Sequence, residues 1–200
     1  MTLTFQDLAQ AMLKCDQTKN QTVYQHGVSV KQHLAELIDA LERLELLPNW
    51  KLPSYLLDYK EQILSNLHSE EVVSAYTVYH DCGKPFCREM DAEGKDHYPN
   101  HADVSKKLFI EAGGDPIAAK LIGWDMVLHS STAEEIQLLC ETEWTTQDAC
   151  TLLLTALAEL HSNCRLFGGM DSISFKSKWK TLERRGKQIC KHFFKEMANG

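Results

Sequence analysis

Apolar residues recur along the chain at helical spacing, and polar capping residues and glycines mark where the segments begin and end. Between residues 22 and 47, one series follows steps of three or four: Val23, His26, Val30, Leu34, Leu37, Leu41 and Leu44. Steps of this size place side chains on one face of an α-helix. Pro48 ends the segment because proline cannot continue a helix. The spacing predicts a long amphipathic helix with His26 on its inner face.

Further helices are predicted by their start and stop signals. Polar residues that favour helix N-termini precede the segments: Ser54, Ser69, Asn100, Asp115, Thr132 and Thr146. Asn100 with Asp103 and Thr132 with Glu135 have the spacing of a capping box. Two glycine pairs are placed as C-terminal stops: Gly113-Gly114 and Gly168-Gly169. The whole chain is therefore predicted to be helical.

The pattern indicates a single all-α domain over residues 1–200, a compact bundle of about seven to eight helices. Its last helix, about residues 174–197, is amphipathic, with apolar residues on one face and lysines elsewhere. No segment alternates convincingly between apolar and polar residues, as a half-buried strand would. The one long irregular segment, about residues 85–99, is a candidate functional loop, because loops of that length in compact domains often are functional.

The net charge of −7 is unevenly distributed. Residues 176–200 carry eight Lys or Arg against Glu183 and Glu196, so this end has a balance of +6 and the rest of the chain −13. An acidic body argues against broad non-specific binding of nucleic acid, which depends on basic groups. The basic end leaves a narrow exception.

The cysteines and the N-terminus bear on location. The seven cysteines are scattered without a CxxC motif, which favours reduced and mostly buried thiols. The first residues lack the basic start and apolar centre of a signal peptide, and no apolar run has the length of a membrane span. We therefore expect a cytoplasmic protein with no membrane partner.

Several of the nine histidines fall at predicted helix ends or inner faces, near acidic residues. Asp125 and His129 are four residues apart and are expected on one helix face. Glu159 lies among apolar residues, where a carboxylate is expected to be nearly buried and to need a partner. The positions concerned are His26, His80, Asp81, His101, Asp125, His129 and Glu159.

Each position alone has an ordinary explanation. A lone histidine on an apolar face is usually a satisfied core residue, and Glu159 could pair with a buried Lys or Arg. One metal centre explains them together, because neutral imidazole and carboxylate are the ligands of borderline divalent metals. The sequence therefore predicts a site for one or two ions of Mn, Fe, Co, Ni or Zn.

The motif HDCGK at residues 80–84, with His26 before it and His101 and His129 after it, resembles the HD superfamily of metal-dependent phosphohydrolases. The resemblance covers about residues 22–165. It departs from the family at the last ligand, which is normally an Asp often preceded by Ala. The similar position here reads Ala158-Glu159, and Asp171 is the alternative; if neither binds, the site holds one ion.

The resemblance implies hydrolysis of a phosphate ester by a metal-activated water. It assigns six metal ligands: His26, His80 and Glu159 on one ion, His101 and His129 on the other, with Asp81 bridging. Lys84 would contact a phosphate oxygen. Asp125 would orient His129 or take part in proton transfer.

Further residues are expected to contact the rest of the substrate. The irregular segment supplies Arg88, Lys95, His97 and Tyr98. His33, seven residues after His26, would line the pocket or replace His26 as ligand, and the spacing to Val30 favours His26. The implied substrate is a small nucleotide, or a nucleic-acid end with a 2′,3′-cyclic or 3′-phosphate.

Three alternatives stay open. The same ligands suit a di-iron oxygenase, although Lys84 favours phosphate chemistry. A non-catalytic helical module that binds a nucleotide would keep only remains of the site. The basic terminal helix is either a core helix with a solvated face or a guide for an RNA or DNA end.

Overall fold

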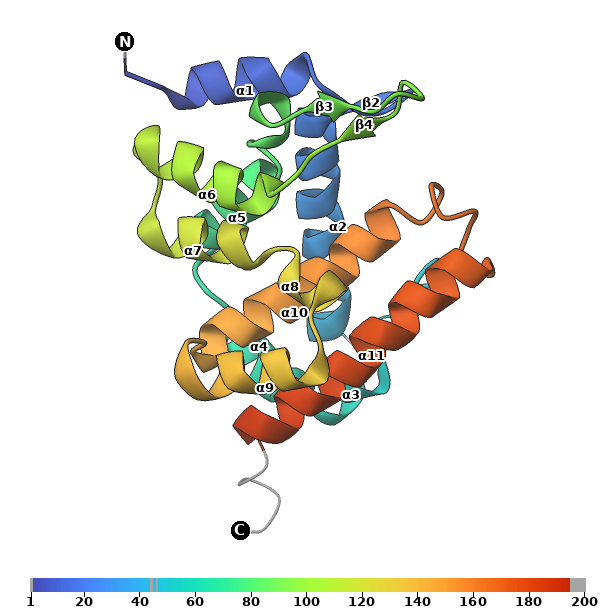
Figure 1. The fold of residues 1–200 in the computed structure, drawn as a ribbon. Coiled ribbons are helices and arrows are strands. Elements are labelled where there is room, and N and C mark those ends of the chain that lie inside the picture. The colour runs from blue at the N-terminus through green and yellow to red at the C-terminus, as the bar shows by residue number, and fades with distance from the viewer. Residues whose placement is uncertain (1, 44, 46, 195–200) are drawn as a thin grey trace. The chain divides into compact units, whose positions relative to one another are not determined.

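The computed structural model describes residues 2–43, 45 and 47–194, and these are mostly helical (Figure 1). The all-α prediction is confirmed. Helices are more numerous than the seven or eight expected. The segment opened by Ser54 divides into α3 (Ser54–Asp58) and α4 (Lys60–Ser65), and two further helices, α1 (Phe5–Leu13) and α8 (Val127–Ser130), were not predicted separately. Leu44 and the expected end of the last helix near residue 197 lie outside the described residues.

Contacts within the chain divide it into two compact units. The first comprises Met1–Lys31 and Ser69–Asp125, and the second comprises Gln32–His68 and Met126–Gly200. The boundary after Lys31 falls inside helix α2 (Val23–Arg43). The prediction of a single domain stays a prediction.

The first unit contains the start of α2 and a set of helices with two small hairpins. Its elements are α1 (Phe5–Leu13), β1 (Asp16–Thr18), β2 (Gln21–Thr22), α5 (Glu70–Tyr79), the 3-10 turn η1 (Lys84–Phe86), β3 (Glu89–Met90), β4 (Asp96–His97), α6 (His101–Glu111) and α7 (Pro116–Trp124). The rings of Phe5, Tyr79 and Phe109 meet with centroids 5.2–5.7 Å apart. Helices α6 and α7 lie side by side (Figure 1).

The hairpins were not predicted from the sequence. Strands β1 and β2 pair antiparallel, as do β3 and β4, and each strand has only two or three residues. Strands this short show no alternation that could reveal them. The irregular segment at 85–99 therefore contains η1 and the β3–β4 hairpin.

Helix starts in the first unit follow the predicted signals with one exception. The Asp115 side chain accepts from the N–H groups of Ile117 and Ala118 at the start of α7, as predicted. The capping box at Asn100 is wrong, because Asn100 makes no side-chain cap bond. Its backbone is left-handed, with φ of 53°, whereas a capping side chain needs an extended backbone.

The second unit is built around α10 (Thr146–Ser162), a helix buried along almost its whole length. The other elements are the end of α2, α3, α4, α8 (Val127–Ser130), α9 (Ala133–Thr142) and α11 (Ile173–Phe194). Helix α11 packs against α10, α9, α3 and α8 (Figure 1). The predicted capping box of Thr132 and Glu135 is present at α9. Among the described residues, no helix combines the length and the apolar character needed to cross a bilayer.

Candidate metal centre

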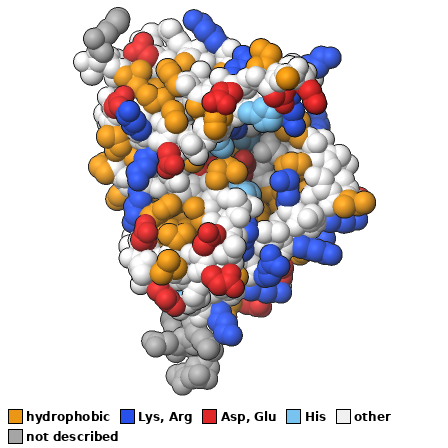
Figure 2. Space-filling view, viewed as in Figure 1, with side chains coloured by type: hydrophobic (Ala, Val, Ile, Leu, Met, Phe, Trp, Pro, Cys, Tyr) orange, Lys and Arg blue, Asp and Glu red, His pale blue; other side chains and the backbone are white. Residues whose placement is uncertain are grey.

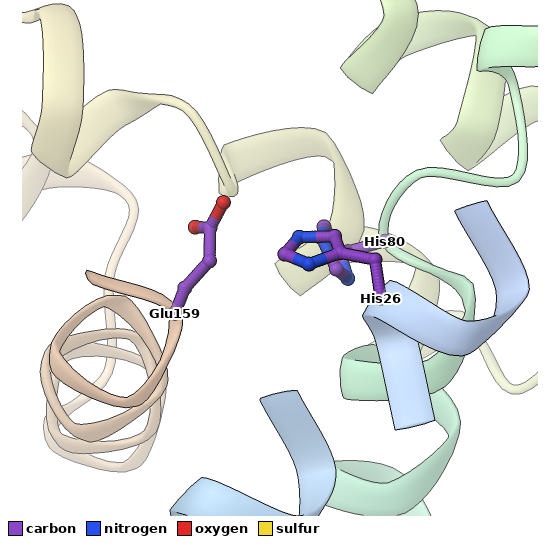
Figure 3. A group of neighbouring side chains, drawn as sticks. All are labelled: His26, His80 and Glu159. Carbon is purple, nitrogen blue, oxygen red and sulfur yellow. The ribbon is translucent and has the colours of Figure 1, made fainter. Parts of the chain in front are cut away.

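The Asp81 carboxylate is the centre of a polar cluster in the first unit. His80 is the C-cap of α5, Asp81 follows it, and both side chains are only 2% exposed. The Nε2 atoms of three histidines lie near the Asp81 oxygens: His80 at 3.3 Å, His101 at 3.4 Å and His26 at 3.9 Å. Figure 3 shows the rings of His26 and His80, whose centroids are 5.2 Å apart.

These separations match those between ligands of one metal ion. With metal–ligand bonds of about 2.1 Å, two ligand atoms at octahedral or tetrahedral angles lie about 3.0–3.4 Å apart. The two shorter Nε2–oxygen distances fall at the upper end of this range, and the distance from His26 is somewhat longer. The donor set of imidazole nitrogens and a carboxylate suits a borderline divalent metal.

The orientation of two imidazoles is fixed by backbone carbonyls. His80 Nδ1 donates to the Thr77 carbonyl at 2.8 Å, and His101 Nδ1 donates to the Tyr98 carbonyl at 3.1 Å. A carbonyl oxygen only accepts, so each Nδ1 carries the proton and each neutral ring presents its Nε2 lone pair toward Asp81. Metal-binding histidines are commonly oriented by such a hydrogen bond on the other ring nitrogen.

Lys84 adds a fixed positive charge to the cluster. Its Nζ lies 2.7 Å from Asp81 Oδ2 and donates to Gln17 Oε1 at 3.0 Å. Burial raises the pKa of the Asp81 carboxyl, but the positive charge of Lys84 opposes burial, and that pKa lies well below its usual range. Asp81 is therefore ionised at neutral pH and available as a ligand.

Two glycines allow the helices that carry the histidines to approach one another. A Cβ on Gly27, next to His26, would overlap the Val78 carbonyl on α5. A Cβ on Gly83 would come within 2.5 Å of the Ser105 amide nitrogen on α6. The Gly83 N–H donates to Ser105 Oγ at 2.7 Å, which fixes the turn after Asp81 against the helix that begins at His101. Glycine is needed at both places because backbone meets backbone.

His129 and Glu159, the two other predicted ligands, lie in the second unit. His129 Nε2 is 3.1 Å from Glu159 Oε2, and the side chains are 18% and 17% exposed. Glu159, also labelled in Figure 3, projects from α10 and is less buried than predicted. That these two residues share a centre with Asp81 stays a prediction.

Arg185 fixes the short helix that carries His129. Its side chain is buried on α11 and donates to the carbonyls of Leu128 and Ser131. These carbonyls lie in and just after α8, where the helix leaves them without partners of its own. Arg185 was not predicted from the sequence, because the basic residues around it indicated only a solvated face.

The expectation that Asp125 and His129 share a helix face is wrong. Helix α7 ends at Trp124 and α8 begins at Val127, so no continuous helix joins the two residues. Asp125 belongs to the first unit, where it is buried and accepts from the Tyr76 hydroxyl at 2.8 Å. The alternative ligand Asp171 is fully exposed beside Lys176 and is not in a metal-binding group of the described residues.

The residues predicted to contact the substrate lie in several separate places in the structure. Arg88 is exposed and forms two hydrogen bonds with Asp96 across the β3–β4 hairpin. His97 pairs with Asp91 in the same hairpin, and the Tyr98 hydroxyl donates to the Asp16 carbonyl. His33 belongs to the second unit, where its ring lies 5.9 Å from that of Trp50. Of these residues, Tyr98 contacts the cluster, since its ring lies 5.6 Å from Lys84 Nζ.

All seven cysteines are free, and five of them are buried. Burial raises the pKa of the Cys82 thiol to about 12, so this neighbour of Asp81 is protonated at neutral pH. Burial also raises the pKa of the Cys87 thiol. Neither residue has the lowered pKa of a nucleophilic thiol.

No family model, curated protein or solved structure matches the chain. The resemblance to the HD superfamily therefore stays a prediction. The first unit brings together His26, His80, Asp81, Lys84 and His101, and it adds Gln17, which sequence analysis missed. Gln17 comes from the β1–β2 hairpin and gives no periodic signal in the sequence.

Proposed function

We propose that the protein is a metal-dependent phosphohydrolase acting on a nucleotide or on a nucleic-acid-end phosphate ester. One observation carries the proposal: three histidine Nε2 atoms and the Lys84 ammonium surround one buried carboxylate, Asp81. Histidine and carboxylate ligands suit a divalent metal, and an adjacent lysine suits an anionic substrate. The metal remains unidentified among Mn, Fe, Co, Ni and Zn.

His26, His80, Asp81 and His101 would hold the ion. When bound, a divalent ion supplies a Lewis acid for phosphoryl oxygens and lowers the pKa of water at the site. The Thr77 and Tyr98 carbonyls keep the His80 and His101 rings in the orientation that ligation needs. Asp81 stays ionised because Lys84 lies 2.7 Å away.

Lys84 would stabilise the negative charge of the phosphate ester. Its ammonium is held at the edge of the cluster between Asp81 and Gln17. A point charge in this position attracts phosphate oxygens without the geometric demand of a guanidinium. Lys84 also favours phosphate chemistry over the di-iron oxygenase alternative.

The test is phosphate release with added Mn²⁺ from nucleoside monophosphates, 2′,3′-cyclic nucleotides and oligonucleotides with 3′-phosphate ends. We expect release from at least one substrate class by the wild type and loss of at least about 10³-fold in Asp81→Asn, since a ligand and its charge are removed. Asp148→Asn is the matched control, because Asp148 is a buried aspartate beside a histidine, His68, in the second unit.

Equal activity in Asp81→Asn and the wild type would contradict the proposal. So would the absence of release from metal-loaded wild type with every substrate. Oxygen consumption by iron-loaded protein would then favour the oxygenase alternative. Circular dichroism of both variants separates loss of the site from loss of the fold.

A further inference from the structure

The solvent-facing side of α11 carries a row of four basic residues. Lys180, Arg184, Lys187 and Lys191 are all exposed. At 100° per residue they fall within about 60° of one another around the helix axis, and at 1.5 Å per residue they span about 16 Å along it. These four residues are called the basic row below.

The opposite side of α11 is occupied by the core of the second unit. Phe175, Leu182 and Ile189 are buried there. The helix is therefore held in place by its apolar face, and the basic row is not required for packing. The row is a surface feature whose charge is available for binding.

Few carboxylates neutralise the positive charge of the basic row. Glu183 accepts from the Ser54 N–H and hydroxyl, and its carboxylate lies 2.6 Å from Lys187 Nζ. Within the described part of the chain, no carboxylate lies within ion-pair distance of Lys180, Arg184 or Lys191. Three of the four charges thus have no ion pair with a described residue, on a protein whose overall charge is negative.

Charges of both signs can be followed along the surface in Figure 2, where Lys and Arg side chains gather over α11. Besides Glu183, acidic residues lie near the row at Gln188, the neighbour of Lys187, which lines a groove with Glu134 and Glu141 of α9. The start of the row, Lys180 and Arg184, is further along α11 from Gln188. These two residues are expected to contribute most to binding an anion.

We propose that the basic row binds the phosphate backbone of nucleic acid. Duplex DNA carries one negative charge per about 1.7 Å of axis when both strands are counted, so a length of duplex equal to the row carries roughly nine phosphate charges. Lys and Arg neutralise such charges and release counterions, which gives affinity without sequence preference. A regularly spaced row suits a polymer of charges better than a single small anion.

An anionic membrane surface fits the same helix less well. A helix that lies on a bilayer inserts an apolar face between the headgroups. The apolar face of α11 is buried inside its own unit, and the residues of the basic row are all charged. Insertion would require α11 to leave the core, whereas phosphate backbone binding requires no rearrangement.

The proposal is independent of the proposed phosphohydrolase activity, because binding needs neither metal nor turnover. The test is fluorescence anisotropy in EDTA with labelled 20-nucleotide probes of one sequence: single-stranded RNA, single-stranded DNA and duplex DNA. Dissociation constants are measured from 50 to 300 mM KCl. Vesicles containing phosphatidylserine are tested in parallel.

The informative variant is Lys180→Gln/Arg184→Gln/Lys191→Gln. Its matched control is Lys14→Gln/Lys107→Gln/Lys178→Gln, which removes the same charge at exposed lysines outside the row. Lys178 lies on α11 itself but on another side of the helix, with its ammonium over the Phe167 ring. Circular dichroism and thermal unfolding confirm that both triple variants fold.

We expect salt-sensitive binding by the wild type. The row variant should bind at least about tenfold more weakly at 50 mM KCl, and its slope of log K against log salt should fall by about two, as expected for three lost contacts with a single strand. The control variant should remain within about threefold of the wild type. A preference for one probe supports the proposal and identifies the nucleic acid.

Three results would overturn the proposal. The first is no measurable binding of any probe at 50 mM KCl. The second is an equal loss of affinity in the row variant and the control, which would mean that net charge alone matters. The third is binding to the vesicles without binding to nucleic acid.

Discussion

Asp81 shows how a few contacts can give one residue a specific chemistry. It is buried, yet the nearby charge of Lys84 keeps its pKa well below the usual range. Two of the histidines around it, His80 and His101, are oriented by hydrogen bonds from Nδ1 to backbone carbonyls. A buried carboxylate in such surroundings is costly unless it binds a cation.

Lys84 is expected to act on substrate as well as on the charge of Asp81. At equal metal loading, Lys84→Gln should lower the rate of phosphate release by about 100-fold, a magnitude typical of losing one charge-stabilising donor. The comparison is made at saturating metal, because the lysine also keeps the ligand Asp81 ionised. Lys107→Gln, at an exposed lysine on α6, is the control. An unchanged rate in metal-loaded Lys84→Gln would remove Lys84 from the proposed mechanism.

His161 provides a test of electrostatics in the second unit. Its Nδ1 donates to the Leu157 carbonyl and its Nε2 accepts from the Lys51 N–H, while burial lowers the pKa of His161 to about 4. The unfolded state, with a histidine pKa near 6.5, binds more protons between these values. Stability from neutral His161 is therefore complete above about pH 6.5 and is lost as pH falls toward 4, by on the order of 3 kcal/mol.

The measurement is the titration of the His161 ring protons by NMR, assigned with His161→Gln. We expect the ring to stay neutral at pH 5.5. Urea unfolding of the wild type should show a midpoint that decreases from pH 7 to pH 4.5. A His161 titration with its midpoint near 6.5 would contradict the assigned hydrogen bonds.

At the scale of the elements, close packing of helix ends determines where the ligands meet. Gly27 lets α2 approach α5 beside His26, and Gly83 lets the turn after Asp81 approach α6 beside His101. Both glycines directly follow, or lie within three residues of, a predicted ligand in the sequence. The glycine of the HDCGK motif is thus required for the close packing of this turn against α6.

Gly83→Ala should separate that turn from α6. The added Cβ would come within 2.8 Å of three atoms of His101 and Ser105, two of them in the backbone, so the free energy of unfolding should fall by about 1–3 kcal/mol and metal affinity should fall with it. Gly123→Ala is the control, because its Cβ would meet only the flexible side chain of Lys106. Chemical denaturation and metal titration provide the readouts. Equal effects of the two substitutions would contradict this role of Gly83.

The sequence predicted elements well where their signals are local. The long amphipathic helix at His26 is confirmed, and so are the caps at Asp115 and Thr132. The break between α7 and α8 was missed, because residues 116–130 contain no proline or glycine at the break to reveal it. The hairpins were missed since their strands are too short for a periodic pattern.

At the scale of the whole molecule, the candidate metal ligands could be predicted from the sequence, but the residues that contact them from distant parts of the chain could not. His80, Asp81 and His101 lie close together in the sequence as well as in the first unit, and His26 joins them from a strong helical pattern. Gln17 reaches Lys84 from 67 residues away through a side-chain amide. Such a long-range contact depends on tertiary packing and leaves no mark in local spacing.

The most direct test of the central claim is equilibrium binding of Mn²⁺ by calorimetry to metal-stripped wild type, Asp81→Asn and the control Asp148→Asn. If the Asp81 cluster is a metal site, the wild type and the control bind at least one ion per chain with similar affinity. Asp81→Asn should then bind at least about 100-fold more weakly, because it replaces the charged ligand. Mn²⁺ binding of equal affinity in Asp81→Asn and the wild type would contradict the account.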